Sequence, residues 1–137
     1  MLCSQTLRFA DTITVDLAGG SAKAVFFVEP AADYLKDHFP GAPTLPGLMM
    51  LESAVRAAAA LWDATEAGAA NRTATLQHVE RLQIVRRVVP GETLTVETAR
   101  ESGGEEPGKT GAGTMIFTAH GSVSGETAMR ARFRLRR

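Results

Sequence analysis

A run of helix-forming residues over positions 47–66 constrains this 137-residue chain more than any other feature. Its apolar positions follow a spacing of three and four, as one face of a helix requires. They are Leu48, Leu51, Val55, Ala59 and Trp62. The other faces are largely alanine, so we expect a helix that is buried on nearly all sides. At 1.5 Å per residue it is roughly 28 Å long, which makes it the centre around which so short a chain folds.

The segments on both sides of this helix have the patterns of β-strands. Strands are predicted over residues 7–15, 22–28, 73–89, 92–100, 114–123 and 127–135. Turns are predicted at 19–20 and 121–125, a short helical turn at 33–37, and an exposed loop at 103–107. One long helix among antiparallel strands predicts a single α+β domain over residues 1–137, with the sheet wrapped around the helix.

Composition narrows the class of protein. Apolar residues make up 45% of the chain, which is ordinary for a globular protein. Lys plus Arg and Asp plus Glu both number 15, which argues against a nucleic-acid partner bound by bulk charge. No stretch has the length of a membrane span, and residues 1–20 lack the pattern of a secretory signal. Cys3 is the only cysteine, and His78 and His120 have no metal-binding spacing. We therefore expect a cytoplasmic protein without a metal site.

The last predicted strand carries a row of arginines. Arg130, Arg132, Arg134 and Arg136 alternate with Ala131, Phe133 and Leu135. A period of two places the arginines on one face of the strand and the apolar residues on the other. The arginine face is interpreted as a solvated outer surface or, alternatively, as a docking surface for an acidic partner.

The residues that can carry chemistry lie between His38 and Glu52. The histidine can exchange a proton near neutral pH, and it precedes a stiff loop with prolines at positions 40, 43 and 46. Glu52 lies in the second turn of the predicted helix, at the edge of the apolar face. Burial there favours a neutral carboxyl that can donate a proton. The N–H groups of Gly47 and Leu48 open the helix without an intrahelical acceptor and can polarise a carbonyl oxygen.

Two sequence blocks resemble a known family. Residues 38–52 read H-F-P-G-A-P-T-L-P-G-L-M-M-L-E, with the acid fourteen positions after the histidine. This pattern resembles that of the β-hydroxyacyl-acyl-carrier-protein dehydratases of type II fatty-acid synthesis. Residues 81–94 read R-L-Q-I-V-R-R-V-V-P-G-E-T-L and resemble that family's arginine-containing strand, which runs into V-x-P-G-[DE]-x-L. The closing strands resemble the family's last hairpin, so the resemblance covers nearly the whole chain.

The resemblance implies a hot-dog fold and the reversible dehydration of a (3R)-hydroxyacyl thioester to the trans-2-enoyl thioester. It implies that His38 removes the C2 proton and that Glu52 protonates the departing hydroxyl. The Gly47 amide would bind the thioester carbonyl. Further substrate contacts would come from Leu48, Phe39 and Pro46. No cofactor would be needed, because the thioester itself makes the C2 proton acidic.

The resemblance also implies partners. The acyl chain would arrive on the phosphopantetheine arm of an acyl carrier protein, and the acidic surface of that protein would suit a row of arginines. The residues predicted to dock it are Arg86, Arg87, Arg134 and Arg136. The family's site lies across a subunit interface, so a homodimer or a trimer of dimers is expected. Burial of Met49, Met50 and Trp62 is expected to need that partner subunit.

Three positions depart from the family pattern. Asp37 stands where glycine or cysteine is usual, Arg56 stands where glutamine is usual, and residues 29–36 lack a glycine-rich approach. Arg56 follows Glu52 by four residues, so the two side chains can pair on the helix. Such a pair would hold Glu52 ionised, against its role as an acid. The departures suggest a divergent branch that serves a polyketide or aryl-polyene pathway, or one that has lost activity.

Two alternatives to a dehydratase stay open. A hot-dog acyl thioesterase would use the helix carboxylate to direct a water molecule, although it has no need of the H-F-P loop. A non-catalytic module that binds acyl thioesters or a carrier protein is the other alternative, and the arginine at position 56 is the reason to keep it.

Overall fold

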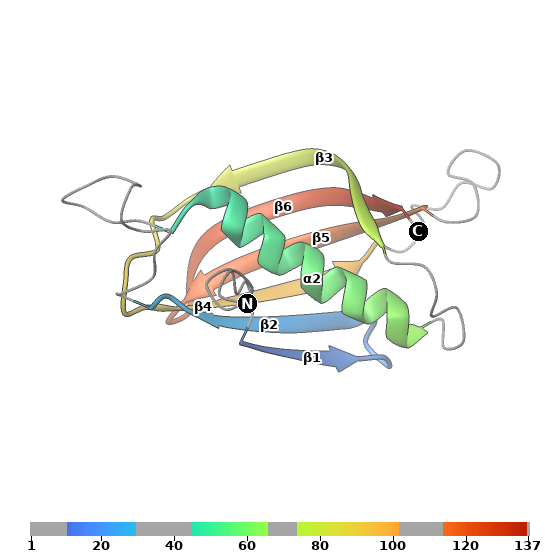
Figure 1. Ribbon diagram of the computed structural model, residues 1–137, viewed down its shortest axis with the longest axis horizontal. Coiled ribbons are helices and arrows are strands. Elements are labelled where there is room, and N and C mark those ends of the chain that lie inside the picture. The colour runs from blue at the N-terminus through green and yellow to red at the C-terminus, as the bar shows by residue number, and fades with distance from the viewer. Residues whose placement is uncertain (1–10, 30–44, 66–73, 102–113, 137) are drawn as a thin grey trace, which may run out of the picture.

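The computed structural model describes residues 11–29, 45–65, 74–101 and 114–136. In chain order these contain β1 (Thr12–Asp16), β2 (Ser21–Phe27), α2 (Gly47–Thr65), β3 (Thr75–Ile84), β4 (Thr93–Arg100), β5 (Thr114–Val123) and β6 (Glu126–Arg136). The strands form one antiparallel sheet in the order β1-β2-β4-β5-β6-β3. Figure 1 shows α2 lying across one face of this sheet, which curves around it. The predicted α+β arrangement is confirmed.

The helix packs mainly on β2 and β4, and its small residues allow a close approach. Ala54, Ala57 and Ala58 are fully buried, and the Thr98 hydroxyl of β4 donates a hydrogen bond to the Ala54 carbonyl (3.3 Å). Larger apolar side chains fill the rest of the space between α2 and the sheet. Among the described residues, no helix combines the length and apolar character needed to cross a membrane.

Aromatic rings connect the helix to the middle of the sheet. The Trp62 ring of α2 lies 6.4 Å from that of Phe117 on β5, centroid to centroid. Phe117 in turn stacks on Phe133 of β6 at 6.0 Å. All three side chains are almost entirely buried, so this row forms the centre of the core.

Two expectations about the helix surface are wrong. Leu48, predicted to lie on the buried face, is 73% exposed, whereas Met50 is buried within the chain itself. Trp62 is likewise buried by the sheet, so neither side chain needs a partner subunit to cover it. Leu51, Val55 and Trp62 of the predicted face are buried, so the difference is confined to the first turn. There the helix contacts the core through Met50 rather than through Leu48.

Strand limits differ from the predicted pattern most at β1 and β3. β1 covers Thr12–Asp16, and residues 7–10 of the predicted strand lie outside the described residues. The predicted strand over 73–89 ends at Ile84, because residues 85–92 leave the sheet and form a separate connection to β4. The turn at 19–20 is confirmed, and the β5–β6 turn is centred on Ser124 and Gly125, both with positive φ. Predicted features over residues 33–37 and 103–107 lie outside the described residues.

Gly121, predicted to open that turn, lies instead within β5 and faces the core. A Cβ atom at this position would lie 2.7 Å from Cγ of Met129 and 3.3 Å from Cδ1 of Leu94. We expect Gly121→Ala to lower the free energy of unfolding by about 1–3 kcal/mol, the usual cost of an overpacked core. Urea unfolding measures this change.

A double-mutant cycle with Met129→Ala tests the cause. Because the shorter side chain removes the clash, Gly121→Ala is expected to cost less in the Met129→Ala background than in the wild type. Equal costs in both backgrounds would show that the contact with Met129 is not responsible.

Candidate functional site

The start of α2 has backbone N–H groups with no acceptor inside the helix. The Pro46 carbonyl accepts hydrogen bonds from the N–H groups of Met49 (3.0 Å) and Met50 (3.3 Å), so the helix opens directly after this proline. The N–H groups of Gly47 and Leu48 therefore have no acceptor within the helix. The first turn holds no acidic side chain that would offset the positive end of the helix dipole. This end of α2 can therefore polarise a carbonyl oxygen.

Glu52 lies one turn further along and is bound to Arg56. Its Oε2 is 3.3 Å from Nε of Arg56, so the predicted pairing of these side chains is confirmed. The expected burial is wrong for the isolated chain, because 40% of the Glu52 side chain is exposed. Leu48 and Arg56 occupy the same exposed side of the helix, which the sheet of the same chain does not cover.

The structure brings four of the predicted site residues together at one end of the helix. Pro46 directly precedes α2, and Gly47, Leu48 and Glu52 lie in its first two turns. His38 and Phe39 lie outside the described residues. The arrangement can therefore supply a carboxylate and backbone donors, and the sequence supplies the histidine fourteen residues earlier.

Arg86, predicted to dock a carrier protein, is bound by two carboxylates. Its Nη1 and Nη2 donate to Oε1 (2.9 Å) and Oε2 (2.7 Å) of Glu92, and its Nε donates to Oε1 of Glu126 (3.1 Å). We call these three side chains the Arg86 cluster. The bonds from Arg86 and from the Val89 N–H lower the pKa of Glu92 to about 2. The roles of Glu92 and Glu126 were not predicted, although the sequence shows the Pro90-Gly91 turn that brings Glu92 back toward Arg86.

The arginines of β6 lie on the outer face of the sheet, as the alternation predicts, and form a second ion-pair group. Nε and Nη2 of Arg132 donate to Oε2 (2.8 Å) and Oε1 (2.7 Å) of Glu101. Arg132 also contacts Glu80, and Arg134 approaches the same carboxylate at 3.8 Å. The Glu101 pKa is lowered by its bonds from Arg132. Docking by Arg87, Arg134 and Arg136 stays a prediction.

The Arg86–Glu92 pair predicts a pH-dependent stability. Arg86 lowers the Glu92 pKa from 4.5 to about 2, so the pair stabilises the fold fully above pH 4.5 and loses this effect as the pH falls toward 2. We expect the free energies of unfolding of the wild type and Glu92→Gln to converge over that range, as measured by urea unfolding. Glu97→Gln, at an exposed position on β4, is the control. Parallel curves for wild type and Glu92→Gln would contradict this assignment.

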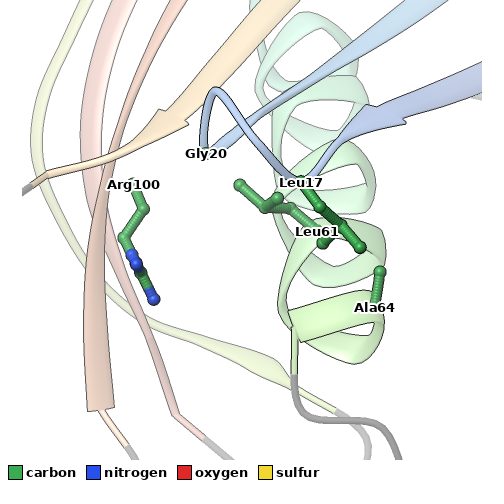
Figure 2. A pocket seen from close by; sticks show the side chains of 5 residues that line it. All are labelled: Leu17, Gly20, Leu61, Ala64 and Arg100. Carbon is green, nitrogen blue, oxygen red and sulfur yellow. The ribbon is translucent and has the colours of Figure 1, made fainter.

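A pocket of about 270 Å³ lies at the opposite end of α2. Figure 2 shows Leu17 and Leu61 on one side of it and Arg100 on the other. Ala64, which also lines it, follows Glu52 by twelve residues, or about 18 Å along the helix. The pocket is therefore separate from the candidate site. Among the described residues, no group of His, Cys, Asp or Glu side chains is placed to hold a metal ion.

Solved structures share this architecture. One chain of the dehydratase heterocomplex ApeI:P from Xenorhabdus doucetiae matches with a TM-score of 0.64 and 19% identity, over 93% of this chain and 96% of that one. The PaaI protein of E. coli, from the phenylacetic acid degradation operon, matches with a TM-score of 0.65 and 19% identity, over 99% and 88%. The protein has the hot-dog fold, as the sequence resemblance implied. Identities this low show the fold alone.

Comparison with known sequences shows the family. The family model of ApeI-like proteins, described as ApeI dehydratase, matches residues 14–110, a range that contains both His38 and Glu52. The chain belongs to this dehydratase family. The 3-hydroxyacyl-[acyl-carrier-protein] dehydratase FabZ of Francisella tularensis subsp. novicida is 30% identical over 76 residues, and FabZ of Francisella philomiragia matches equally well. These matches span 48% of this chain and 47% of the relatives, so only about half the length of each is compared.

The Glu52–Arg56 pair predicts a small effect on turnover. We expect Arg56→Gln to raise kcat by about twofold or less, because Glu52 then loses an exposed i,i+4 partner that is worth about 0.3–0.5 kcal/mol. Arg56→Lys keeps the charge and is the control. Equal kcat values for wild type and Arg56→Gln would show that the pair has no influence on the reaction.

Proposed function

We propose that the protein dehydrates (3R)-hydroxyacyl thioesters to trans-2-enoyl thioesters, with His38 as the base, Glu52 as the acid and the Gly47 amide as the carbonyl donor. The observation that carries this proposal is the family match over residues 14–110, which includes His38 and Glu52 at the spacing of the dehydratase motif. The position of Gly47 and Glu52 on the first two turns of one helix supports it.

The proposed reaction needs only these groups. The imidazole of His38 takes the C2 proton, and negative charge develops on the thioester oxygen, where the Gly47 N–H stabilises it. The double bond then forms between C2 and C3 as the C3–O bond breaks. The Glu52 carboxyl gives its proton to the departing hydroxyl, which leaves as water. No electrons leave the substrate, so the proposal includes no redox cofactor. It includes no metal, because the thioester itself makes the C2 proton acidic.

A carrier protein is the proposed source of the substrate, and both proteins are proposed to be cytoplasmic. Its phosphopantetheine arm would bring the thioester to the start of α2, in the synthesis of a fatty acid or a related polyketide or aryl polyene. Arg87 and Arg136 are exposed, which suits an acidic docking partner. Arg86 suits this role less, because two carboxylates already bind it.

A homodimer, alone or as part of a trimer of dimers, is proposed on the evidence of the β3 edge. β3 pairs with β6 on one side, and most of its residues are exposed in the chain by itself. Leu76, Ile84 and Val85 are at least 40% exposed along this edge, and Leu48 projects near its end at the start of α2. A second chain placed edge to edge would cover these side chains and bring its own residues toward Glu52.

A thioesterase is the second candidate, and the state of Glu52 is the observation that favours it. A carboxylate that is 40% exposed and paired with Arg56 suits a base that activates water, as a thioesterase needs. The thioesterase stays the second candidate, because the Glu52–Arg56 pair has only a small effect on the rate. An exposed helix pair of about 0.3–0.5 kcal/mol changes a rate by only about twofold, so it does not prevent Glu52 from acting as an acid. A twofold effect on the rate is likewise too small to abolish activity, so the pairing with Arg56 does not favour a non-catalytic module.

One assay separates the three functions. The protein is incubated with a four-carbon trans-2-enoyl thioester of a small thiol, and the enoyl absorbance and free thiol are followed together. Loss of absorbance without thiol release, which is hydration in the reverse direction, is the expected result. Release of thiol would identify a thioesterase, and neither change would identify a binding module; both would overturn the proposed function.

A further inference from the structure

The connection between β3 and β4 is held in place by the Arg86 cluster. This connection, residues 85–92, leaves the sheet after Ile84 and returns to it at Thr93. Within it, Glu92 binds Arg86 through both carboxylate oxygens and also accepts the Val89 N–H (3.0 Å). The Arg86 guanidinium also donates to the Arg87 carbonyl (3.0 Å). The cluster therefore joins Arg86, near the start of the connection, to Glu92 at its end.

The same connection is attached to the closing hairpin. The N–H groups of Val85 (2.8 Å) and Arg86 (3.2 Å) both donate to the Ala128 carbonyl of β6. Glu126, the first residue of that strand, binds Arg86 through its carboxylate. Arg86 thus fixes the connection to the β5–β6 hairpin.

The β3–β4 connection also contacts the residues that directly precede α2. The Leu45 N–H donates to the Val88 carbonyl (2.8 Å), and both side chains are almost completely buried. Leu45 directly precedes Pro46, whose carbonyl opens the helix. Just before the connection, the Ile84 side chain lies close against Gly47, where an added Cβ would be 3.3 Å away. Residues 84–88 therefore determine where the helix begins.

We infer that Arg86 is a positioning residue, which holds the Gly47 end of α2 in the place the reaction requires by fixing the β3–β4 connection against the hairpin. This inference rests on the proposed function, because it assigns the Arg86 cluster a part in the same site. A bidentate arginine–carboxylate pair restricts the relative orientation of its two side chains more than a single ion pair does. The Arg86 and Glu92 side chains are half-buried, with 27% and 24% exposed, so loss of the pair is also expected to lower stability. A displacement of about 1 Å at a catalytic group can cost about 10²-fold in rate.

The chain supplies a matched control. Arg132 makes an equivalent bidentate pair with Glu101 and also contacts Glu80, but it lies on the outer face of the sheet, on the side opposite α2. A loss that followed from weaker ion pairing in general would appear equally in Arg132→Gln and in Arg86→Gln.

The test compares Arg86→Gln and Arg132→Gln with the small-thiol enoyl thioester, which needs no carrier protein and so removes any docking effect. We expect Arg86→Gln to lower kcat by about 10- to 100-fold with a much smaller change in KM, and Arg132→Gln to leave kcat nearly unchanged. Arg86→Lys keeps the charge without the fork and is expected to fall between wild type and Arg86→Gln. Similar urea unfolding of the two glutamine variants would exclude a general loss of stability as the cause.

Amide hydrogen exchange gives a readout that does not depend on activity. The Leu45 N–H, bonded to Val88, is expected to exchange faster in Arg86→Gln than in Arg132→Gln or the wild type. Unchanged exchange at Leu45, or equal losses of kcat in both glutamine variants, would overturn the inference. If the wild type itself shows no hydration, the proposed function fails, and the exchange result alone then decides whether the cluster holds the start of α2.

Discussion

Replacing His38 with alanine is expected to lower the hydration rate of a trans-2-enoyl thioester by about 10²–10⁴-fold, the usual contribution of a general base. In the proposed reaction this imidazole exchanges the C2 proton, and no other described side chain at the start of α2 can take over that role: Glu52 is already assigned to the hydroxyl. The measurement is kcat/KM with the small-thiol substrate.

A matched histidine serves as the control. His120 lies on the outer face of β5, where its Nε2 is 2.9 Å from Oγ1 of Thr127. His120→Ala is expected to keep nearly wild-type activity, because this ring lies on the face of the sheet opposite α2. A His38→Ala protein that keeps its hydration rate would rule out the mechanism written above.

Mixing two inactive variants is expected to restore activity, because the proposed site takes its histidine from one subunit and its acid from the other. His38→Ala and Glu52→Ala proteins are each inactive alone, since every site lacks one group. After dissociation and reassociation, a mixed dimer has one site with both groups and one site with neither. With random pairing half the dimers are mixed, so about a quarter of wild-type activity returns.

Each variant reassociated with itself is the control for this experiment. Sites built within a single chain would still lack one group in every dimer, so no activity would return. A mixture that stays as inactive as its components, although it forms dimers of normal size, would therefore contradict the shared site.

The local pattern of the chain was enough to predict most elements. β5 has the predicted limits, α2 begins at the predicted residue, and β6 is longer than predicted by one residue at each end. These elements have a clear period, because β6 alternates arginine with buried apolar residues and α2 contains no residue that interrupts a helix. Such signals depend only on neighbours in sequence, which is why they could be used without the structure.

Two errors came from contacts that are distant in sequence. Residues 85–89 have the β-branched composition of a strand, but Arg86 binds Glu126, forty residues later, and the segment leaves the sheet. Nothing near position 86 indicates that partner. Leu48 was placed on the buried face because alanines surround α2 and leave its orientation undetermined until the sheet is known. Glu52 was expected to be buried for the same reason.

Part of the candidate site could be predicted from the local sequence, and part depends on contacts that are distant in sequence. The motif spacing predicted that Gly47 and Glu52 belong to one helix start, and the pairing of Glu52 with Arg56 followed from their separation of four residues. The Arg86 cluster could not be found by spacing alone. Its three members come from the β3–β4 connection and from β6, and only the folded sheet brings them together.

The sheet order has a consequence for how the chain folds. β3 has one strand neighbour among the described residues, and that neighbour is β6, the last described strand. During synthesis β3 leaves the ribosome about fifty residues before its neighbour does. The edge of β3 that pairs with β6 therefore stays without a partner until translation of the hairpin is complete, a situation that slows folding and favours aggregation. A nascent or truncated chain that lacks β6 loses two strands rather than one, and with them the attachment of the helix start.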